Sequence, residues 1–181
     1  NFGWFVQLSL DAVDTTGAAE IVRICPTGIP PWPLSQLVPR YRAQAALPLV
    51  DGAIHRPRWT LLPGIAPARN AQAVAKSVLP LARRLHNKQP FDAIDAQFFW
   101  PDGPAAMIVA QTLGLPFSIK ARGADIHHWT TIAGCREQIV AAAQGASGLL
   151  AVSEAIKADI AALGVEPAKI RVHHTGIDRT L

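Results

Sequence analysis

The chain has 181 residues, half of them hydrophobic, which suits one globular domain with a sizeable core. Its formal charge of +4 comes from Lys and Arg residues scattered along the sequence, with no arginine-rich run or aromatic ribonucleoprotein-type motif, so no nucleic-acid partner is expected. Its two cysteines form no C-x-x-C pair, no apolar stretch reaches the roughly 20 residues of a membrane span, and no signal-peptide pattern begins the chain; we therefore expect a cytoplasmic protein with reduced thiols.

Short apolar runs alternate with longer segments of helical periodicity along the chain, a pattern typical of a parallel sheet wrapped by helices. Strands are predicted at 20–25, 53–59, 91–98, 117–121, 148–152 and 170–175. Helices are predicted at 4–14, 68–88, 102–113, 131–144 and 153–163. The pattern therefore predicts an α/β fold, a Rossmann-like parallel sheet with helices on both faces.

Residues 26–50 interrupt this alternation. They contain five prolines by position 39 and show no clean period, so an extended loop with a short helix is expected. The helix ends are clearer: "LGLP" at 113–116 and "LGVEP" at 163–167 each place Gly at a helix C-terminus with Pro just after it.

Ligands of open parallel sheets bind at the carboxyl ends of the strands, so the residues that follow each predicted strand are the first candidates. In "QFFWPDG", Asp102 stands at a helix N-terminus, where its carboxylate would accept hydrogen bonds from free backbone amides. Gly103 would let another group approach closely. Capping is the simpler interpretation of Asp102, and a ligand contact is the alternative.

The stretch "IKARGADIHHW" at 119–129 places Arg122, Gly123 and Asp125 directly after a predicted strand. The glycine would clear space for a substrate, and the guanidinium could bind phosphate or hydroxyl groups. An Arg122–Asp125 ion pair that only holds the loop is the competing interpretation. The spacing alone does not choose between them.

Two histidine pairs raise the question of a metal site. Adjacent side chains point in different directions, and Asp125 is the only carboxylate near His127 and His128, so three ligands would not meet at one point and no metal is expected. His173 and His174 are interpreted as an alternating pair on a strand.

Ser153 and Glu154 could be a nucleophile and its base, but no glycine-flanked elbow surrounds the serine. Ser153 is better interpreted as the N-cap of the following helix. The sequence also has no G-x-G-x-x-G or Walker loop, which argues against a dinucleotide or ATP site.

Two long segments together resemble a known family: "FDAIDAQFFWPDGPAAMIVAQTLGLPFSIKARGADI" at 91–126 and "ASGLLAVSEAIKADIAALGVEPAKIRVHHTGID" at 146–178. They are similar to the N-terminal half of a retaining GT-B glycosyltransferase of the large family 4, also called group 1. The resemblance spans roughly residues 1–178 and is weak before residue 90. It implies that 1–175 form the acceptor-binding Rossmann-like domain and that 176–181 begin a linker to a C-terminal donor-binding domain.

The resemblance extends to single positions. Relatives begin with a strand that leads into a glycine-bearing loop, so Gly3 would match that loop and the first strand would be missing here. Arg122 stands where many relatives have His, although some exopolysaccharide-type bacterial members have this R-G-x-D-I form. Thr175 replaces the usual Asn of the final turn, whereas Gly176 and Asp178 match.

The family implies transfer of a sugar from a nucleotide-sugar donor to a glycan or lipid-linked acceptor, with retention of configuration and without metal or other cofactor. The donor would bind in the C-terminal domain, so this chain alone is expected to be inactive. The resemblance and the motifs together nominate these residues: catalytic Arg122 and Asp125, and substrate-binding Gly3, Asp102, Gly103, Gly123, Ser153 and Glu154.

Two other functions fit the sequence. One is a non-catalytic acceptor-binding or interaction module, and the other is a GT-B-type nucleotide-sugar epimerase. Because acceptors in the family are often lipid-linked, peripheral contact with the inner face of the membrane is also expected. Its candidate surfaces are the Trp32 loop and the helix at 68–88, whose basic residues are Arg69, Lys76, Arg83, Arg84 and Lys88. The alternative for that helix is a solvated face that covers the sheet.

Overall fold

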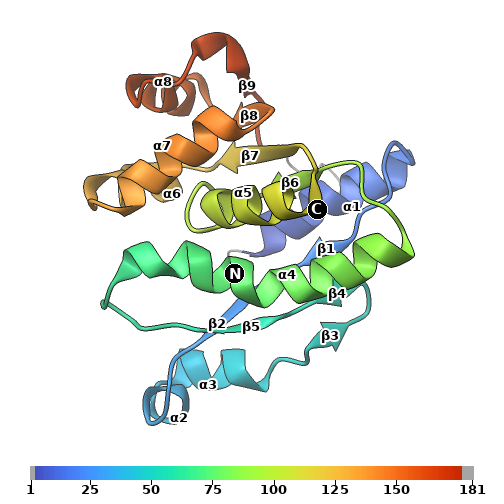
Figure 1. The fold of residues 1–181 in the computed structure, drawn as a ribbon, viewed down its shortest axis with the longest axis vertical. Helices are drawn as coiled ribbons and strands as arrows, with labels where there is room; N and C mark the ends of the chain where they lie inside the picture. Colours follow the sequence, from blue (N-terminus) through green and yellow to red (C-terminus); the bar gives the residue numbers. More distant parts are fainter. Residues whose placement is uncertain (1–2, 177–181) are drawn as a thin grey trace.

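A computed structural model of the chain describes residues 3–176, with side chains from Phe5 onward. The predicted linker at 176–181 and Asp178 therefore lie outside the described residues, apart from Gly176. The chain divides into two regions that follow each other in sequence, residues 21–91 and residues 92–176. The fold is α/β with parallel strands, as predicted (Figure 1).

The second region contains a parallel sheet with its strands in chain order. Its strands are β6 (Ile94–Ala96), β7 (Phe117–Ala121), β8 (Gly148–Ala151) and β9 (Ile170–Val172). The connecting helices are α5 (Asp102–Leu113), α7 (Cys135–Gly145) and α8 (Glu154–Ala162). Ile119 of β7 pairs with Ala96 and Leu149, and all three are buried, so this sheet forms the centre of the main core.

The first region is built from much shorter strands. These are β1 (Arg23–Ile24), β2 (Thr27–Ile29), β3 (Val50–Asp51), β4 (Ile54–His55) and β5 (Arg58–Thr60). β2 pairs with β5 and β1 with β4, both in parallel, and β3 runs antiparallel to β4. The single strand predicted at 53–59 is thus two strands, separated at Pro57, which has no backbone N–H to donate to a ladder.

The expectation of an extended loop at 26–50 was wrong in most of its length. β2 lies there and is followed by two helices, α2 (Leu34–Leu37) and α3 (Pro39–Ala46). Proline at the first position of α3 is compatible with a helix because that N–H has no intrahelical partner. Tyr41 is the buried side chain of α3 and anchors it against the domain.

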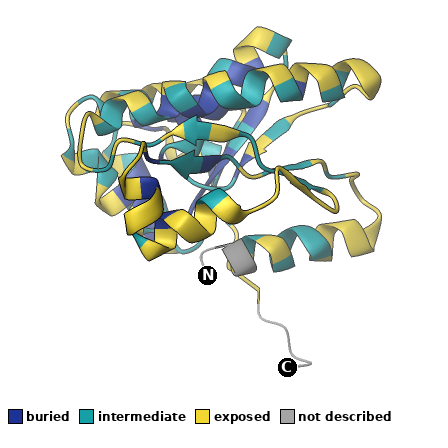
Figure 2. Ribbon diagram, turned by 90° about the horizontal axis from the view of Figure 1, so that it is seen from below, coloured by how far each residue is buried: buried dark blue, intermediate teal, exposed yellow. Residues whose placement is uncertain are grey.

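Helices cover both sides of the strands. After a short 3₁₀ turn (Pro67–Arg69), α4 (Asn70–Lys88) packs along α5 through Ala71, Val74 and Ala75. Figures 1 and 2 show α4 on one side of the strand layer and α1 (Gly3–Thr16) on the other. The prediction of helices on both faces is confirmed.

Within residues 3–176, β2 and β5 form one ladder and β6 to β9 another, and no strand precedes α1. Gly3, which the sequence places in a loop, is the first residue of α1. The remaining short elements follow β7 and α8: α6 (Ala124–His127) and the 3₁₀ turns Trp129–Thr131 and Pro167–Lys169.

Candidate functional site

A cavity of about 640 Å³ lies where β6, β7, β8 and β9 end. Its walls come from α1, from the β6–α5 loop, from α6 and the turn after it, and from the residues after β8 and β9. The lining residues are Phe5, Phe98, Trp100, Arg122, Ala124, Asp125, His128, Trp129, Val152 and Thr175. The carboxyl ends of the parallel strands therefore meet at a cavity, as the sheet rule predicts.

Arg122 follows β7 and is half-buried in the wall of this cavity. Its Nε donates to the Gln97 carbonyl oxygen at 3.1 Å and one terminal nitrogen donates to the Gln97 side-chain oxygen at 2.7 Å. The guanidinium also lies 5.6 Å from the centre of the Phe98 ring. Burial lowers the pKa of Arg122, and the nearby Asp125 and Asp95 oppose this effect, so the group stays a cation at neutral pH.

Asp125 is buried and does not form the ion pair with Arg122 that the sequence allowed. Its two carboxylate oxygens instead accept the backbone N–H of Phe99 at 2.8 Å and the backbone N–H of Arg122 at 3.0 Å. One carboxylate thereby ties the β6–α5 loop to the end of β7. These contacts indicate that Asp125 fixes the cavity wall next to the Arg122 guanidinium.

Gly123 joins β7 to α6 with φ +119° and ψ −78°. Residues with a side chain rarely adopt such a φ, so the turn requires glycine for its backbone conformation. The carbonyl of Gly123 accepts the N–H groups of Ile126 and His127, which starts α6 at the cavity.

Asp102 and Gly103 begin α5 next to the cavity but do not line it. The capping prediction for Asp102 was wrong: Pro101 occupies the N-cap, and the helix has no side-chain capping bond. Burial, followed by the charge of Asp125, raises the pKa of Asp102 to about 7. A Cβ at Gly103 would lie 3.0 Å from Cδ1 of Ile119. The group that this glycine allows to come close is therefore Ile119 of β7, and not a ligand.

Ser153 is the N-cap of α8, as predicted, and its hydroxyl accepts the N–H of Ile156 at 3.3 Å. Glu154 is the exposed first residue of α8, and neither residue lines the cavity. Gly3 begins the helix that brings Phe5 to the cavity. The predicted residues therefore fall into two groups: Arg122 and Asp125 line the cavity together, whereas the substrate-binding candidates do not line it, although Gly123 stands between the lining residues Arg122 and Ala124.

The two adjacent histidines diverge, as predicted. His127 Nε2 lies 2.8 Å from a carboxylate oxygen of Asp159 on α8, whereas His128 lines the cavity and meets the Trp129 ring edge-on. Among residues 3–176 no group of three His, Cys, Asp or Glu side chains could hold a metal ion. The absence of a metal from the reaction stays a prediction.

Sequence reasoning missed the aromatic character of the cavity. Phe98 and Trp100 come from "QFFWPDG" and Trp129 from "IHHW", so the same two motifs that supplied the polar candidates supply the rings. The centres of Trp100 and Trp129 are 5.9 Å apart. The indole N–H of Trp100 is buried and has no hydrogen-bond partner in the described part of the chain.

Lys120 was also missed. It is buried within β7, and its Nζ lies 2.9 Å from Nδ1 of His173, just after β9. Burial lowers the pKa of Lys120, the positive charge of Arg122 lowers it further, and Asp95 opposes both. The alternation of "FSIKA" places Lys120 on the same face of the strand as Ser118, and its contact with His173 gives the buried ammonium a polar partner.

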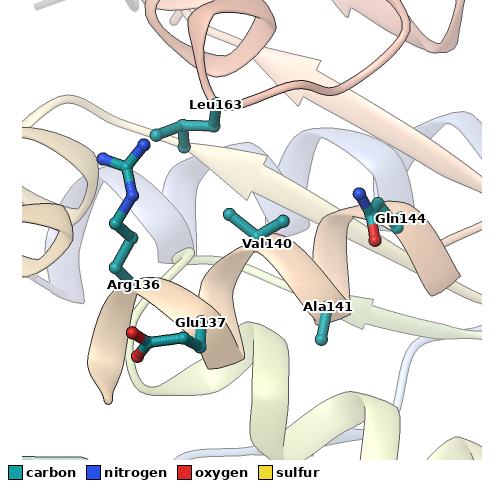
Figure 3. A pocket seen from close by; sticks show the side chains of 6 residues that line it. All are labelled: Arg136, Glu137, Val140, Ala141, Gln144 and Leu163. Carbon is teal, nitrogen blue, oxygen red and sulfur yellow. The ribbon is translucent and has the colours of Figure 1, made fainter. Parts of the chain in front are cut away.

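A second hollow, of about 400 Å³, runs along α7. Figure 3 shows its lining: Arg136, Glu137, Val140, Ala141 and Gln144 on α7, with Leu163 at the end of α8. None of the predicted site residues lies there. The cavity around Arg122 is therefore the candidate site.

Comparison with known proteins agrees with the fold and with the resemblance in the motifs. The sequence model described as Glycosyltransferase Family 4 matches residues 24–181. The chain belongs to this family. A search of curated proteins found no match.

Solved structures that resemble the chain include two of the Anabaena protein Alr3699/HepE, one in complex with UDP and one in complex with UDP and glucose. Their TM-scores are 0.51 and 0.50, at 16% and 18% identity, over 69% and 70% of this chain. The chain spans about a third of the length of these relatives, 31% and 32%. The fold is thus that of the N-terminal domain of a GT-B enzyme, as predicted.

Proposed function

We propose that the full-length protein is a hexosyltransferase that moves a sugar from a nucleotide-sugar donor to a hydroxyl of a glycan or lipid-linked acceptor, with retention of configuration. Membership of the glycosyltransferase family supports the reaction class. UDP-sugars are the first donors to test because the solved relatives bound UDP. A C-terminal domain would bind the donor, and no metal or cofactor takes part.

The reaction would take place in the cytoplasm, in a protein of the exopolysaccharide-type bacterial branch. Two unpaired cysteines, Cys25 and Cys135, are compatible with a reducing compartment. No helix in the described part of the chain is long and apolar enough to cross a bilayer. Any membrane contact of the described residues would therefore be made from the surface of the domain.

The observation that carries the proposal is the cavity in which aromatic rings surround one guanidinium. The C–H faces of a sugar ring are apolar and pack against rings such as Trp129 and Phe98. The hydroxyl groups around the same sugar need hydrogen-bond partners, which Arg122 would provide. The cavity wall would thus orient the acceptor hydroxyl for its attack on the donor sugar.

Arg122 has donors to spare for this role. A guanidinium carries five N–H groups, and Gln97 accepts two of them. The remaining groups would bind an acceptor hydroxyl or the departing diphosphate, whose negative charge grows in the transition state. Gln97 and the Phe98 ring would hold the planar group in one orientation.

Arg122→Ala in the full-length enzyme should lower kcat/KM for transfer by on the order of a hundredfold, since a preorganised charged donor is lost. Arg122→Lys should recover little, because a lysine cannot keep both bonds to Gln97. Arg136→Ala, an exposed arginine on α7, is the matched control and should leave transfer unchanged. Wild-type turnover by a folded Arg122→Ala variant would remove Arg122 from the site.

The same assay separates the two other functions. Saturable binding of an acceptor glycan with no transfer from any nucleotide sugar would favour a non-catalytic module. Conversion of a nucleotide sugar in the absence of an acceptor would favour an epimerase. Analysis of the anomeric configuration of the product by NMR tests retention directly.

A further inference from the structure

Charge is strongly segregated between the two regions of the domain. Residues 21–91 contain ten of the 17 Lys and Arg residues of the chain but only one of its 13 acidic residues, Asp51. The Lys and Arg residues are spread along the sequence, as noted, but the acidic residues are not. The modest net charge of the chain therefore hides one strongly positive region and one negative remainder.

The positive region also exposes large apolar side chains. The α2–α3 hairpin, defined here as residues 31–46, holds Trp32 at 80% exposed, Leu37 at 74% and Leu34 at 43%. Figure 2 shows the helices of this hairpin mostly exposed. Ser35 and Tyr41 are the buried residues of α2 and α3, so the hairpin is anchored on one side and open on the other.

Arginines lie directly beside these apolar residues. Arg40 and Arg42 of α3 are both exposed, and neither forms an ion pair among residues 3–176. Arg40 instead stacks on the Tyr41 ring, with its Cζ 4.6 Å from the ring centre. Tryptophan, leucine and arginine are therefore presented together with no acidic side chain between residues 21 and 50.

The helix that the sequence nominated for membrane contact is a weaker candidate. The apolar residues of α4, among them Val74, Ala75 and Ala82, pack inside the domain. Apart from Pro80, its exposed residues are polar or basic, including Lys76, Arg83 and Arg84. α4 can add long-range attraction to an anionic surface, but it has no free apolar face to insert.

We propose that the α2–α3 hairpin docks the protein on an anionic phospholipid bilayer, with Trp32, Leu34 and Leu37 entering the interface and Arg40 and Arg42 contacting phosphate groups. The docking deepens the proposed function, on which it rests, because it brings the cavity to a lipid-linked acceptor. In membranes, tryptophan side chains favour the level of the headgroups, and arginine side chains favour the level of the phosphates.

Charge complementarity favours a bilayer over the other partners that a basic surface could bind. A nucleic acid would explain the exposed arginines, but it would not explain the exposure of Trp32 and Leu37 unless bases stacked on them. A second copy of the chain would cover the apolar residues, but it would bring two strongly positive regions together. A bilayer with anionic headgroups satisfies both the charge and the exposed apolar surface.

The test is co-sedimentation of the full-length protein with vesicles, without any nucleotide sugar. Binding is expected to vesicles of equimolar phosphatidylglycerol and phosphatidylcholine at low salt, and not to phosphatidylcholine alone. About 0.5 M salt should release most of the protein because the phosphate contacts are screened. No sedimentation with the anionic vesicles at low salt overturns the proposal.

Variants identify the surface. Trp32→Ser with Leu37→Ser should lower the partition coefficient about tenfold, and Arg42→Glu should lower it about threefold. Arg136→Glu, an equal charge change at an exposed site on α7, should have a much smaller effect than Arg42→Glu. Equal binding by the wild type and the double variant overturns the assignment to the hairpin.

Two further measurements exclude the other partners and separate this proposal from the enzymatic one. Binding to single-stranded RNA without binding to vesicles, or a dimer that the double variant abolishes without vesicle binding, overturns the proposal. The double variant should transfer sugar to a water-soluble acceptor within about twofold of the wild type, because the hairpin does not line the cavity. Vesicle binding with no transfer at all contradicts the proposed function and leaves the docking surface standing.

Discussion

The two regions of the domain, residues 21–91 and residues 92–176, differ in the length of their strands and in the continuity of their sheets. The second has strands of three to five residues in one continuous parallel sheet, and its side chains form most of the main core. The first has strands of two or three residues in separate small ladders. The candidate site lies almost wholly on the second region, and the exposed basic surface lies on the first.

The difference fits the two proposed roles, a fixed site on the second region and a membrane-docking surface on the first. Side chains that hold a reacting group in place need fixed supports, and Arg122 has such supports in the half-buried Gln97 and Phe98 and in the buried Asp125 carboxylate. A membrane surface demands no such precision, since lipids adapt to the side chains that they meet. Trp32 and Leu37 can therefore lie on a short, exposed hairpin.

Asp125→Ala should give the largest loss of stability, because the rigidity of the second region depends on this buried carboxylate. Removing it leaves the N–H groups of Phe99 and Arg122 without their partner, at a cost of about 2 to 4 kcal/mol in the free energy of unfolding. Urea unfolding of wild type and variant measures the change. Asp159→Ala, which removes an exposed contact to His127, is the control and should cost less than about 1 kcal/mol.

A loss below about 1 kcal/mol for Asp125→Ala would contradict the comparison. It would mean that the β6–α5 loop keeps its position without the carboxylate and that the site is held by the sheet alone.

Gly28→Ala tests whether the short strands of the first region are nevertheless tightly packed. A Cβ at Gly28 would lie 2.9 Å from the Trp59 ring of β5 and 3.2 Å from Cβ of Leu61, so we expect a loss of about 1 to 3 kcal/mol. Gly148→Ala in β8 has open space around the new methyl group and should change stability by less than about 0.5 kcal/mol. Thermal unfolding followed by circular dichroism measures both variants.

Equal stability of the Gly28→Ala and Gly148→Ala variants would show that the β2–β5 ladder can shift to accommodate the added methyl group at little cost in free energy. The first region would then be loosely packed as well as short-stranded. A clear loss at Gly28 alone would instead restrict the looseness to the exposed hairpin.

The sequence predicted the second region far better than the first, for a physical reason. The strand at 117–121 and the helix at 102–113 are confirmed at both ends, because a Gly114 stop in the left-handed conformation and Pro116 just before the strand are strong local signals. β2 was missed because "TGI" gains its strand conformation from pairing with β5, some 30 residues later. Such a short strand has no period of its own.

The candidate site was predicted in its position and only partly in its contacts. Strand ends pointed to Arg122 and Asp125, and the cavity brings them together. The choice of partner could not be predicted: Arg122 binds Gln97, 25 residues away, and Asp125 binds backbone groups that no sequence pattern marks. The aromatic residues were visible in the motifs, but only their convergence from separate loops makes them a wall.

Asp102→Asn should give the smallest effect, and it tests the contact between the two regions. Asp102 begins α5 in the second region. Burial is the main cause that raises the pKa of Cys25 in the first region, and the charge of Asp102 adds to it, so the two groups lie near each other. Burial and Asp125 raise the pKa of Asp102 to about 7. Since its pKa in the unfolded chain is about 4, the folded state binds the extra proton between pH 4 and 7, and stability falls as pH rises through that window.

Asparagine removes this penalty, so Asp102→Asn should be more stable than the wild type by about 1 to 2 kcal/mol at pH 8, and about equally stable at pH 4.5. Urea unfolding at the two pH values gives both differences, and Asp92→Asn, a change at a residue before β6, serves as the control. A gain of the same size at both pH values would trace to packing instead of charge. The carboxyl of Asp102 would then be ionised in the folded protein, and the space between the two regions would be open to water.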